Sequence, residues 1–300
     1  GVTTETLTVS STTTALSRHQ FRCVVSSNGI SVNSDAALLR VAPTAHNFSG
    51  SDDFTSSAHW SAPTMLMNGG SRLNFANGRL EHVVSSPSDE GAALRDWTAN
   101  VGSYMQDWAV QVDVHLASLG LSDEQYANLN LLVLNAAEAT NSIGQMDRMS
   151  ITFHCDSAIR VQSQVAAYYA GTLHDSGHLG GQVTGTNDIA LRITFDSATK
   201  ELSSWYDADG SAGGYNWTLH HTVNIGSGEY TWDMTDDSTF VVALVGASKD
   251  ATLTSGQAYF DNFQASTQGA VLHDWNGDGI VSIVGDVPPF VQCVYFNNCP

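Results

Sequence analysis

Basic residues are scarce in this chain, which has 11 Lys and Arg against 30 Asp and Glu in 300 residues and a formal net charge of -19. Nucleic acids and anionic membrane surfaces attract proteins through clustered basic side chains. The charge balance therefore argues against nucleic acid as a partner and favours cations and uncharged ligands. No apolar run approaches the roughly 20 residues that a membrane-spanning helix needs, so we expect no transmembrane segment.

Cysteine is also scarce, with four residues in the chain. Cys293 and Cys299 lie close together near the end of the sequence and are a candidate disulfide in an oxidising compartment. Cys155 ends the stretch 149–155, in which every second residue is apolar, and we expect a buried thiol there. No pattern indicates a cysteine nucleophile.

Helical periodicity is missing from every long stretch, whereas the alternation typical of strands recurs. Residues 107–116 place Trp, Val, Val, Val and Leu on one face and polar side chains on the other. Residues 189–195 alternate, turn through 196–200 and return as 201–206. About a dozen strands of this kind between 44 and 268, without a sign of a second core, predict an all-β, two-sheet jelly roll.

Three segments of this region resemble the concanavalin A-like lectin/glucanase superfamily, which includes laminin G-like modules. They are 51–54, the hairpin 191–196 with 202–207, and 259–263. The resemblance implies a jelly-roll sandwich over 44–268 in which the closing strand 259–263 pairs beside the opening strand. Asp261 and Asp53 would then be neighbours and candidates for a second calcium site, although an ordinary Asp-rich turn explains them equally well.

Residues 1–42 contain three short strand-like stretches, 6–9, 20–25 and 36–41. Phe21-Arg22-Cys23 has the aromatic-x-Cys form of strand F in an immunoglobulin-like domain, and 34–41 resembles the strand that follows it. The segment therefore resembles the last three strands of such a domain. Two interpretations stay open: a truncated sandwich, or strands that another chain completes by β-augmentation.

Residues 269–300 contain the spacing D-x-N-x-D-G-x-x-S, the front half of an EF-hand calcium loop. The candidate ligands are the side chains of four residues and one main-chain carbonyl: Asp274, Asn276, Asp278, Ser282 and the carbonyl of Ile280. Loop position 12 is Gly285, and Asp286, one place later, is the candidate that closes the cage. An acidic turn without an ion is the alternative.

This tail resembles the dockerin type I repeat, on the evidence of Asp274, Asn276, Asp278 and Gly279. The resemblance implies calcium, an extracellular or cell-surface setting and a docking partner. Dockerins usually carry two such loops, and this tail has one.

Catalytic patterns are missing from the sequence. Glycan-cleaving members of the lectin/glucanase superfamily carry a carboxylate motif like E-x-D-x-x-E on one strand, and this chain has none. The adjacent acids 89–90 and 123–124 lie in turn-like surroundings. His174, Asp175 and His178 contain zinc-ligand residue types, but their Gly-rich surroundings favour surface histidines. We therefore expect a protein that is not an enzyme.

Sugar binding requires exposed aromatic rings beside polar groups that read hydroxyls. The candidate rings are Trp205, Tyr206, Tyr215, Trp217 and Trp232, with core packing as the default for each tryptophan. The leading hypothesis is a secreted or cell-surface, non-catalytic adhesion or glycan-binding module, with a glycan or another surface protein as partner. The alternatives are a self-assembling structural subunit of an extracellular fibre or surface layer, and a glycoside hydrolase with an unrecognised site.

Overall fold

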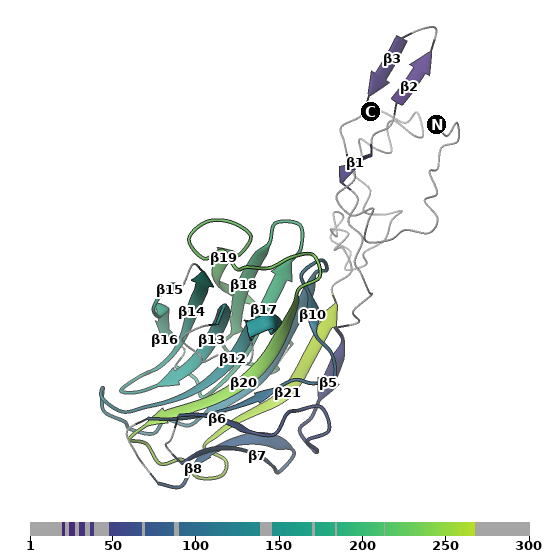
Figure 1. Ribbon diagram of the computed structural model, residues 1–300. Coiled ribbons are helices and arrows are strands. Elements are labelled where there is room, and N and C mark those ends of the chain that lie inside the picture. The colour runs from purple at the N-terminus through teal and green to yellow at the C-terminus, as the bar shows by residue number, and fades with distance from the viewer. Residues whose placement is uncertain are drawn as a thin grey trace, which may run out of the picture. The chain divides into compact units, whose positions relative to one another are not determined.

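The computed structural model describes most of the chain between residues 48 and 267 and short strands before it (Figure 1). The described ranges are 20–21, 24–27, 30–33, 37–38, 48–67, 70–86, 90–138, 146–169, 172–183, 185–212 and 214–267. The chain divides into two units, Gly1–Thr267 and Gln268–Pro300, and all described residues belong to the first. The predicted calcium loop and the predicted disulfide Cys293–Cys299 lie outside the described residues.

Four short strands precede the main domain. β1 (Gln20–Phe21) pairs with β4 (Ala37–Leu38), and β2 (Val24–Ser27) pairs with β3 (Ile30–Asn33), both antiparallel. Strand structure therefore occurs inside the predicted stretches 20–25 and 36–41. The stretch 6–9 lies outside the described residues, and the immunoglobulin-like assignment stays a prediction.

The main domain is a sandwich of two antiparallel sheets, which confirms the predicted all-β, two-sheet jelly-roll class. The first sheet has nine strands in the order β15 (Thr172–Asp175), β14 (Ile159–Tyr169), β13 (Arg148–Cys155), β12 (Tyr126–Asn135), β20 (Thr239–Lys249), β9 (Gly91–Asp96) and β6 (Thr64–Met67), with β10 (Gly102–Ser103) beside β20 and β16 (Leu179–Val183) beside β14. Within the described residues, the one helical turn is the 3-10 segment Ala136–Glu138.

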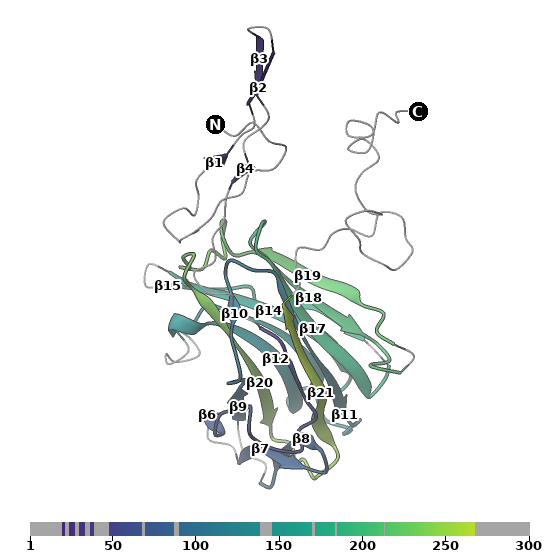
Figure 2. The ribbon, with the colours of Figure 1, turned by 90° about the vertical axis from the view of Figure 1, so that its right-hand side faces the viewer.

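The second sheet has eight strands, several of which lie side by side in Figure 2. Their order is β19 (Thr218–Asn224), β18 (Glu201–Asp207), β17 (Asp188–Asp196), β11 (Trp108–Leu116), β21 (Ala258–Thr267), β8 (Arg79–Val84) and β7 (Ser71–Ala76), with β5 (Gly50–Asp52) beside β21. β5 pairs with β21 through Asp52 and Phe263, which confirms the predicted contact of opening and closing strands. The predicted hairpin is β17–β18.

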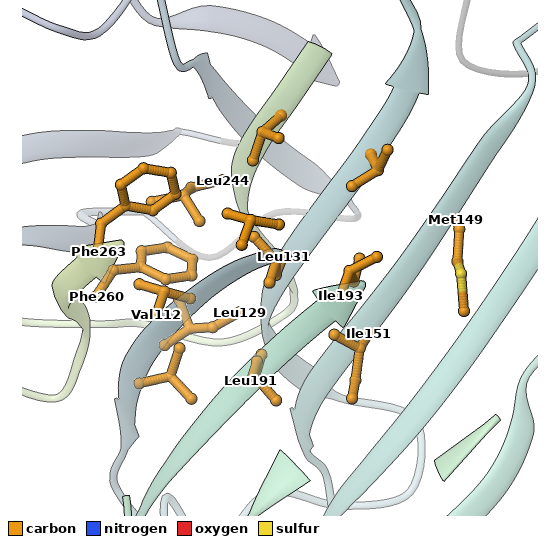
Figure 3. Packing of buried hydrophobic residues seen from close by; sticks show 14 of the residues in the cluster. Val112, Leu129, Leu131, Met149, Ile151, Leu191, Ile193, Leu244, Phe260 and Phe263 are labelled. Atoms are coloured by element: carbon orange, nitrogen blue, oxygen red, sulfur yellow. The ribbon is translucent and has the colours of Figure 1, made fainter. Parts of the chain in front are cut away.

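The core lies between the sheets and follows the alternation in the sequence. On β11, Trp108, Val110, Val112, Val114 and Leu116 are all buried. Figure 3 shows side chains from both sheets in contact. The labelled residues are Val112, Leu191, Ile193, Phe260 and Phe263 from the eight-stranded sheet and Leu129, Leu131, Met149, Ile151 and Leu244 from the nine-stranded sheet. Cys155 is buried as predicted, and burial raises the pKa of its thiol.

Two polar clusters cross this core. Ser163 Oγ on β14 lies 2.8 Å from Ser204 Oγ on β18 and 2.8 Å from His220 Nδ1 on β19. Near β8, His82 Nε2 lies 3.3 Å from Ser71 Oγ, and that hydroxyl lies 3.3 Å from Ser248 Oγ on β20. Burial of the imidazole lowers the pKa of His82 to about 4, so this side chain is neutral at pH 7.

Across the described residues, no helix has the length and apolar character needed to cross a membrane.

Candidate ligand-binding site

A hollow of about 450 Å³ lies on the outer face of the nine-stranded sheet. Six adjacent strands line it, β14, β13, β12, β20, β9 and β6, so this face of the sheet is concave. The lining residues are Leu66, Met67, Glu90, Ala92, Tyr126, Asn128, Asn130, Leu132, Arg148, Ser150, His154, Gln162, Gln164, His178, Val245 and Ala247.

Carboxamides and hydroxyls occupy one half of this hollow, on β12, β13 and β14. Strand alternation turns these residues away from the core, because the residues between them are buried in it. The register places the polar groups in rows across the sheet: Asn128 is opposite His154, and Asn130 is opposite Thr152. Thr152 is in turn opposite Gln162, and Ser150 is opposite Gln164.

Aliphatic side chains occupy the other half, on β20, β9 and β6. The same rows continue there, with Ala247 opposite Asn128 and Val245 opposite Asn130. These residues belong to an apolar cluster on the outer face of the sheet that is separate from the main core. Its buried members are Ala92, Leu94, Leu132, Leu134, Met146, Ala243 and Val245, with Leu66, Val241 and Ala247 against them. The hollow is therefore polar on one side and apolar on the other.

The two asparagines of β12 differ in their bonding. Asn130 Oδ1 accepts a hydrogen bond of 2.5 Å from Thr152 Oγ1, and Asn130 Nδ2 donates one of 3.2 Å to the carbonyl of Val245. Asn128 Oδ1 is shut off from solvent and has no hydrogen-bond partner among the described residues. Asn130 is thus held by the protein, whereas Asn128 is not.

Ion pairs neutralise the arginines at the margin of the hollow. Arg148 Nη2 lies 3.1 Å from Asp175 Oδ2, and Gln164 Nε2 donates to both oxygens of that carboxylate at 3.0 Å. Arg160 pairs with Asp156 in the same way. The charges of both guanidinium groups are therefore matched by carboxylates of the protein.

Two rings flank the polar half. Tyr126 and His154 lie 5.9 Å apart between ring centroids, and the Tyr126 hydroxyl donates to Glu90 Oε1 at 2.8 Å. Burial lowers the pKa of His154, although its contact of 3.1 Å with Asp156 opposes this. A neutral imidazole that donates from Nε2 to this carboxylate has Nδ1 left as an acceptor.

Two of the predicted aromatic residues, Trp205 and Tyr206, lie on β18 of the other sheet, and Tyr215 and Trp217 lie in the loop before β19. Tyr215 and Trp217 stack at 5.0 Å between centroids, the Arg192 guanidinium lies 5.3 Å from the Trp217 ring, and Trp205 is opposite Arg192 across the strands. Trp205, Tyr206, Tyr215 and Trp217 are partly exposed, and Tyr206 also contacts the core.

Trp232 corrects the sequence prediction, because it is 2% exposed and belongs to the main core cluster. It lies in a loop, so alternation gave no sign of its burial. Its ring is not available to a ligand in this structure.

The candidate residues of the predicted second calcium site have partners within the protein. Asp52 Oδ1 accepts from the amide of Phe54, and its Oδ2 lies 2.9 Å from His59 Nδ1. Asp53 accepts from Thr55, while Asp261 is opposite Asp113 across the strands. Burial raises the pKa of Asp261, and the negative charges of Asp113 and Asp53 raise it further. In the described part of the chain, no three His, Cys, Asp or Glu side chains are placed to hold a metal.

The histidine-rich turn 174–178 is part of the hollow's margin. His178 is exposed and lines the hollow, and Asp175 binds Arg148 and Gln164. The sequence analysis missed the lining amides. Their alternation, Asn128-Leu-Asn130 and Gln162-Ser-Gln164, was the signal that pointed to them.

Comparisons with known proteins give structural similarity and no sequence family. No protein-family model matches the chain, and no curated protein matches it. One similar solved structure is the VIP36 exoplasmic/lumenal domain in its Ca2+/Man3GlcNAc-bound form, with a TM-score of 0.46 and 10% identity over 77% of this chain and 93% of that chain.

Two further similar structures come from a bacteriophage and from a bacterium. The CBM2 module of the evolved Dit of Lactobacillus casei BL23 phage J-1 has a TM-score of 0.48 and 11% identity over 73% of this chain and 95% of that chain. The GH43 BlXynB protein from Bacillus licheniformis has a TM-score of 0.43 and 12% identity over 82% of this chain and 46% of that chain. At this level of similarity, these structures assign no ligand or activity to the chain.

Proposed function

We propose that the sandwich is a non-catalytic glycan-binding module of a secreted or cell-surface protein, and that the glycan occupies the hollow of the nine-stranded sheet. The observation that carries the proposal is the division of this hollow into an amide and hydroxyl half and an aliphatic half. A sugar ring has the same division, with C–H groups on its faces and hydroxyls on its edge. The volume of about 450 Å³ falls within the range of ligand sites.

Binding without cleavage is part of the proposal. Hydrolysis of a glycosidic bond by the usual mechanism uses two carboxyl groups that flank the bond. Among the described residues that line the hollow, Glu90 is the one carboxylate, and Tyr126 donates to it. Measurement of reducing ends released from each bound glycan tests this point, and their release would contradict it.

The calcium site proposed for the tail, residues 269–300, rests on the sequence alone. We propose that Asp274, Asn276 and Asp278 bind calcium, with Ser282, Asp286 and the carbonyl of Ile280 completing the loop. Alternate oxygen ligands and a glycine at position 6 support this assignment.

A glycan array probed with the full chain in calcium tests the proposed function. The variant Ala247→Trp fills the aliphatic half of the hollow, and Gln264→Trp places the same side chain on the outer face of the other sheet. We expect glycan binding by the wild type and by Gln264→Trp, with at least a tenfold loss for Ala247→Trp. Absence of binding to every glycan would overturn the proposal.

A further inference from the structure

The polar groups that line the hollow fall into two sets, those already bonded within the protein and those without a partner. Asn130 is bonded through both atoms of its carboxamide, and Gln164 Nε2 is bonded to Asp175. In the described part of the chain, no side-chain hydrogen bond joins Asn128 or Gln162 to a neighbour. Hydrogen bonds to a ligand are therefore open to these two carboxamides, as they are to His154 Nδ1.

Asn128 differs from Asn130 in the bonding of its carboxamide oxygen. Its Oδ1 is buried and accepts no hydrogen bond from the described residues, and a buried polar atom without a partner carries a free-energy cost. The terminal torsion of an asparagine is soft. A small rotation would let this oxygen accept a hydrogen bond from a ligand hydroxyl. That bond would remove the free-energy cost of the unbonded atom, so Asn128 is suited to bind hydroxyl groups.

The charges around the hollow indicate whether its ligand is charged or neutral. Arg148 and Arg160 are each paired with a carboxylate, Asp175 and Asp156. Glu90 adds a third carboxylate, and the lowered pKa of His154 keeps its imidazole neutral near pH 7. In and beside the hollow there are therefore three carboxylates and two guanidinium groups, in a chain whose formal net charge is -19. An anionic ligand would be repelled, and it would find both guanidinium groups already engaged.

We propose that the hollow selects uncharged glycans and reads their hydroxyl groups through Asn128 and Gln162, with Asn130, Gln164 and Arg148 as supports held by the protein. This inference rests on the proposed function, because it names the ligand class of the same site. The aliphatic half on β20 and β9 receives the C–H face of the sugar, and the amide half receives its edge.

The test uses polysaccharide pairs that differ in charge and share a backbone: dextran with dextran sulfate, and fully methyl-esterified with de-esterified homogalacturonan. Neutral β-glucan, mannan, xylan and galactan extend the neutral set. The full chain, Asn128→Ala, Gln162→Ala and the control Gln111→Ala, on the outer face of the other sheet, are compared by binding and by thermal unfolding. Gln111 is a matched control because its carboxamide lies on the other sheet, where it interacts with Gln264 and Tyr215 and does not line the hollow.

We expect binding within the neutral set, at least tenfold weaker binding to every charged counterpart, and a loss of at least tenfold in Asn128→Ala and Gln162→Ala with no fall in melting temperature. Gln111→Ala retains binding. Preference for the charged member of a pair, or neutral binding that survives both substitutions, would overturn this inference and leave the proposed function standing. If the wild type binds none of the polysaccharides and no glycan on the array, the proposed function itself fails.

Discussion

Arg148 and Asp175 form an ion pair of 3.1 Å at the margin of the hollow, between β13 and the end of β15. The guanidinium side chain is 10% exposed and the carboxylate 28% exposed. Burial lowers the pKa of Arg148, and the charge of Asp175 opposes that shift. The pair therefore holds a largely buried positive charge beside the polar half of the hollow.

Replacement of Asp175 tests this relationship. Asp175→Asn keeps the shape of the side chain and removes its negative charge from beside the largely buried guanidinium of Arg148. We expect a loss of about 1–3 kcal/mol in unfolding free energy and about 2–4 °C in melting temperature per kcal/mol. Asp188→Asn is the control, because Asp188 is 68% exposed and pairs with His115 at the surface. Equal losses in both variants would contradict the account.

Acid sensitivity of the fold is expected from His82. Burial lowers the pKa of this imidazole to about 4 from 6.5, so the unfolded chain takes up a proton before the folded protein does. Its contribution to stability is complete above pH 6.5 and is lost as the pH falls toward 4. The expected loss is about 3 kcal/mol, measured by urea unfolding between pH 7 and 4. His82→Met should have a shallower pH dependence, and an unchanged slope would show that another group is responsible.

Gly246 is expected to be intolerant of a side chain. A Cβ built at this residue would lie 2.5 Å from His82 Cγ, inside the polar cluster that joins the two sheets. Gly246→Ala should lose about 1–3 kcal/mol in unfolding free energy through overpacking. Gly181→Ala, where a Cβ meets nothing within 4 Å, is the control. The double variant with His82→Ala should recover part of the loss, and strict additivity of the two changes would argue against the contact.

The aromatic residues of the eight-stranded sheet give a test of which face binds. Trp217 stacks on Tyr215 and lies beside Arg192, on the sheet opposite the hollow. If the glycan occupies the hollow, Trp217→Ala should leave its dissociation constant unchanged within about twofold, which corresponds to less than about 0.5 kcal/mol. A tenfold loss, with the melting temperature retained, would move the site to this face.

Calcium binding by the tail is expected from its spacing of oxygen ligands. Asp274→Ala and Asp278→Ala each remove a carboxylate from the loop, and titration calorimetry should show at least a tenfold loss of calcium affinity. Asp123→Ala removes an exposed acid from a turn of the sandwich and should change nothing. Hydrogen exchange in residues 270–300 that is the same with calcium and with a chelator would contradict the prediction.

The sandwich was predictable because alternation is a local property. The period of two that begins at Trp108 fixed which residues of β11 enter the core, and a one-residue shift would have exposed all five. The pairing of the opening strand with the closing strand followed from the resemblance to a known fold, and the register of Asp52 opposite Phe263 confirms it.

The hollow was not predictable in the same way. Alternation shows that Asn128 and Asn130 point away from the core, but not that six strands curve around them. That curvature depends on pairings between distant strands and on irregularities such as the one between Met65 and Met67 on β6. Trp232 was misjudged for a related reason, since loop residues carry no period from which burial is read.

The most direct test of the account is NMR of the full chain during titration with neutral gluco-, manno-, xylo- and galacto-oligosaccharides. The side-chain amide signals of Asn128 and Gln162, on the lining of the hollow, are resolved from the indole signals of Trp205 and Trp217 by chemical shift and by single substitutions. The account predicts that binding shifts the two carboxamide signals and leaves the indole signals in place. Shifts confined to the indoles, with the carboxamides unchanged, would contradict it.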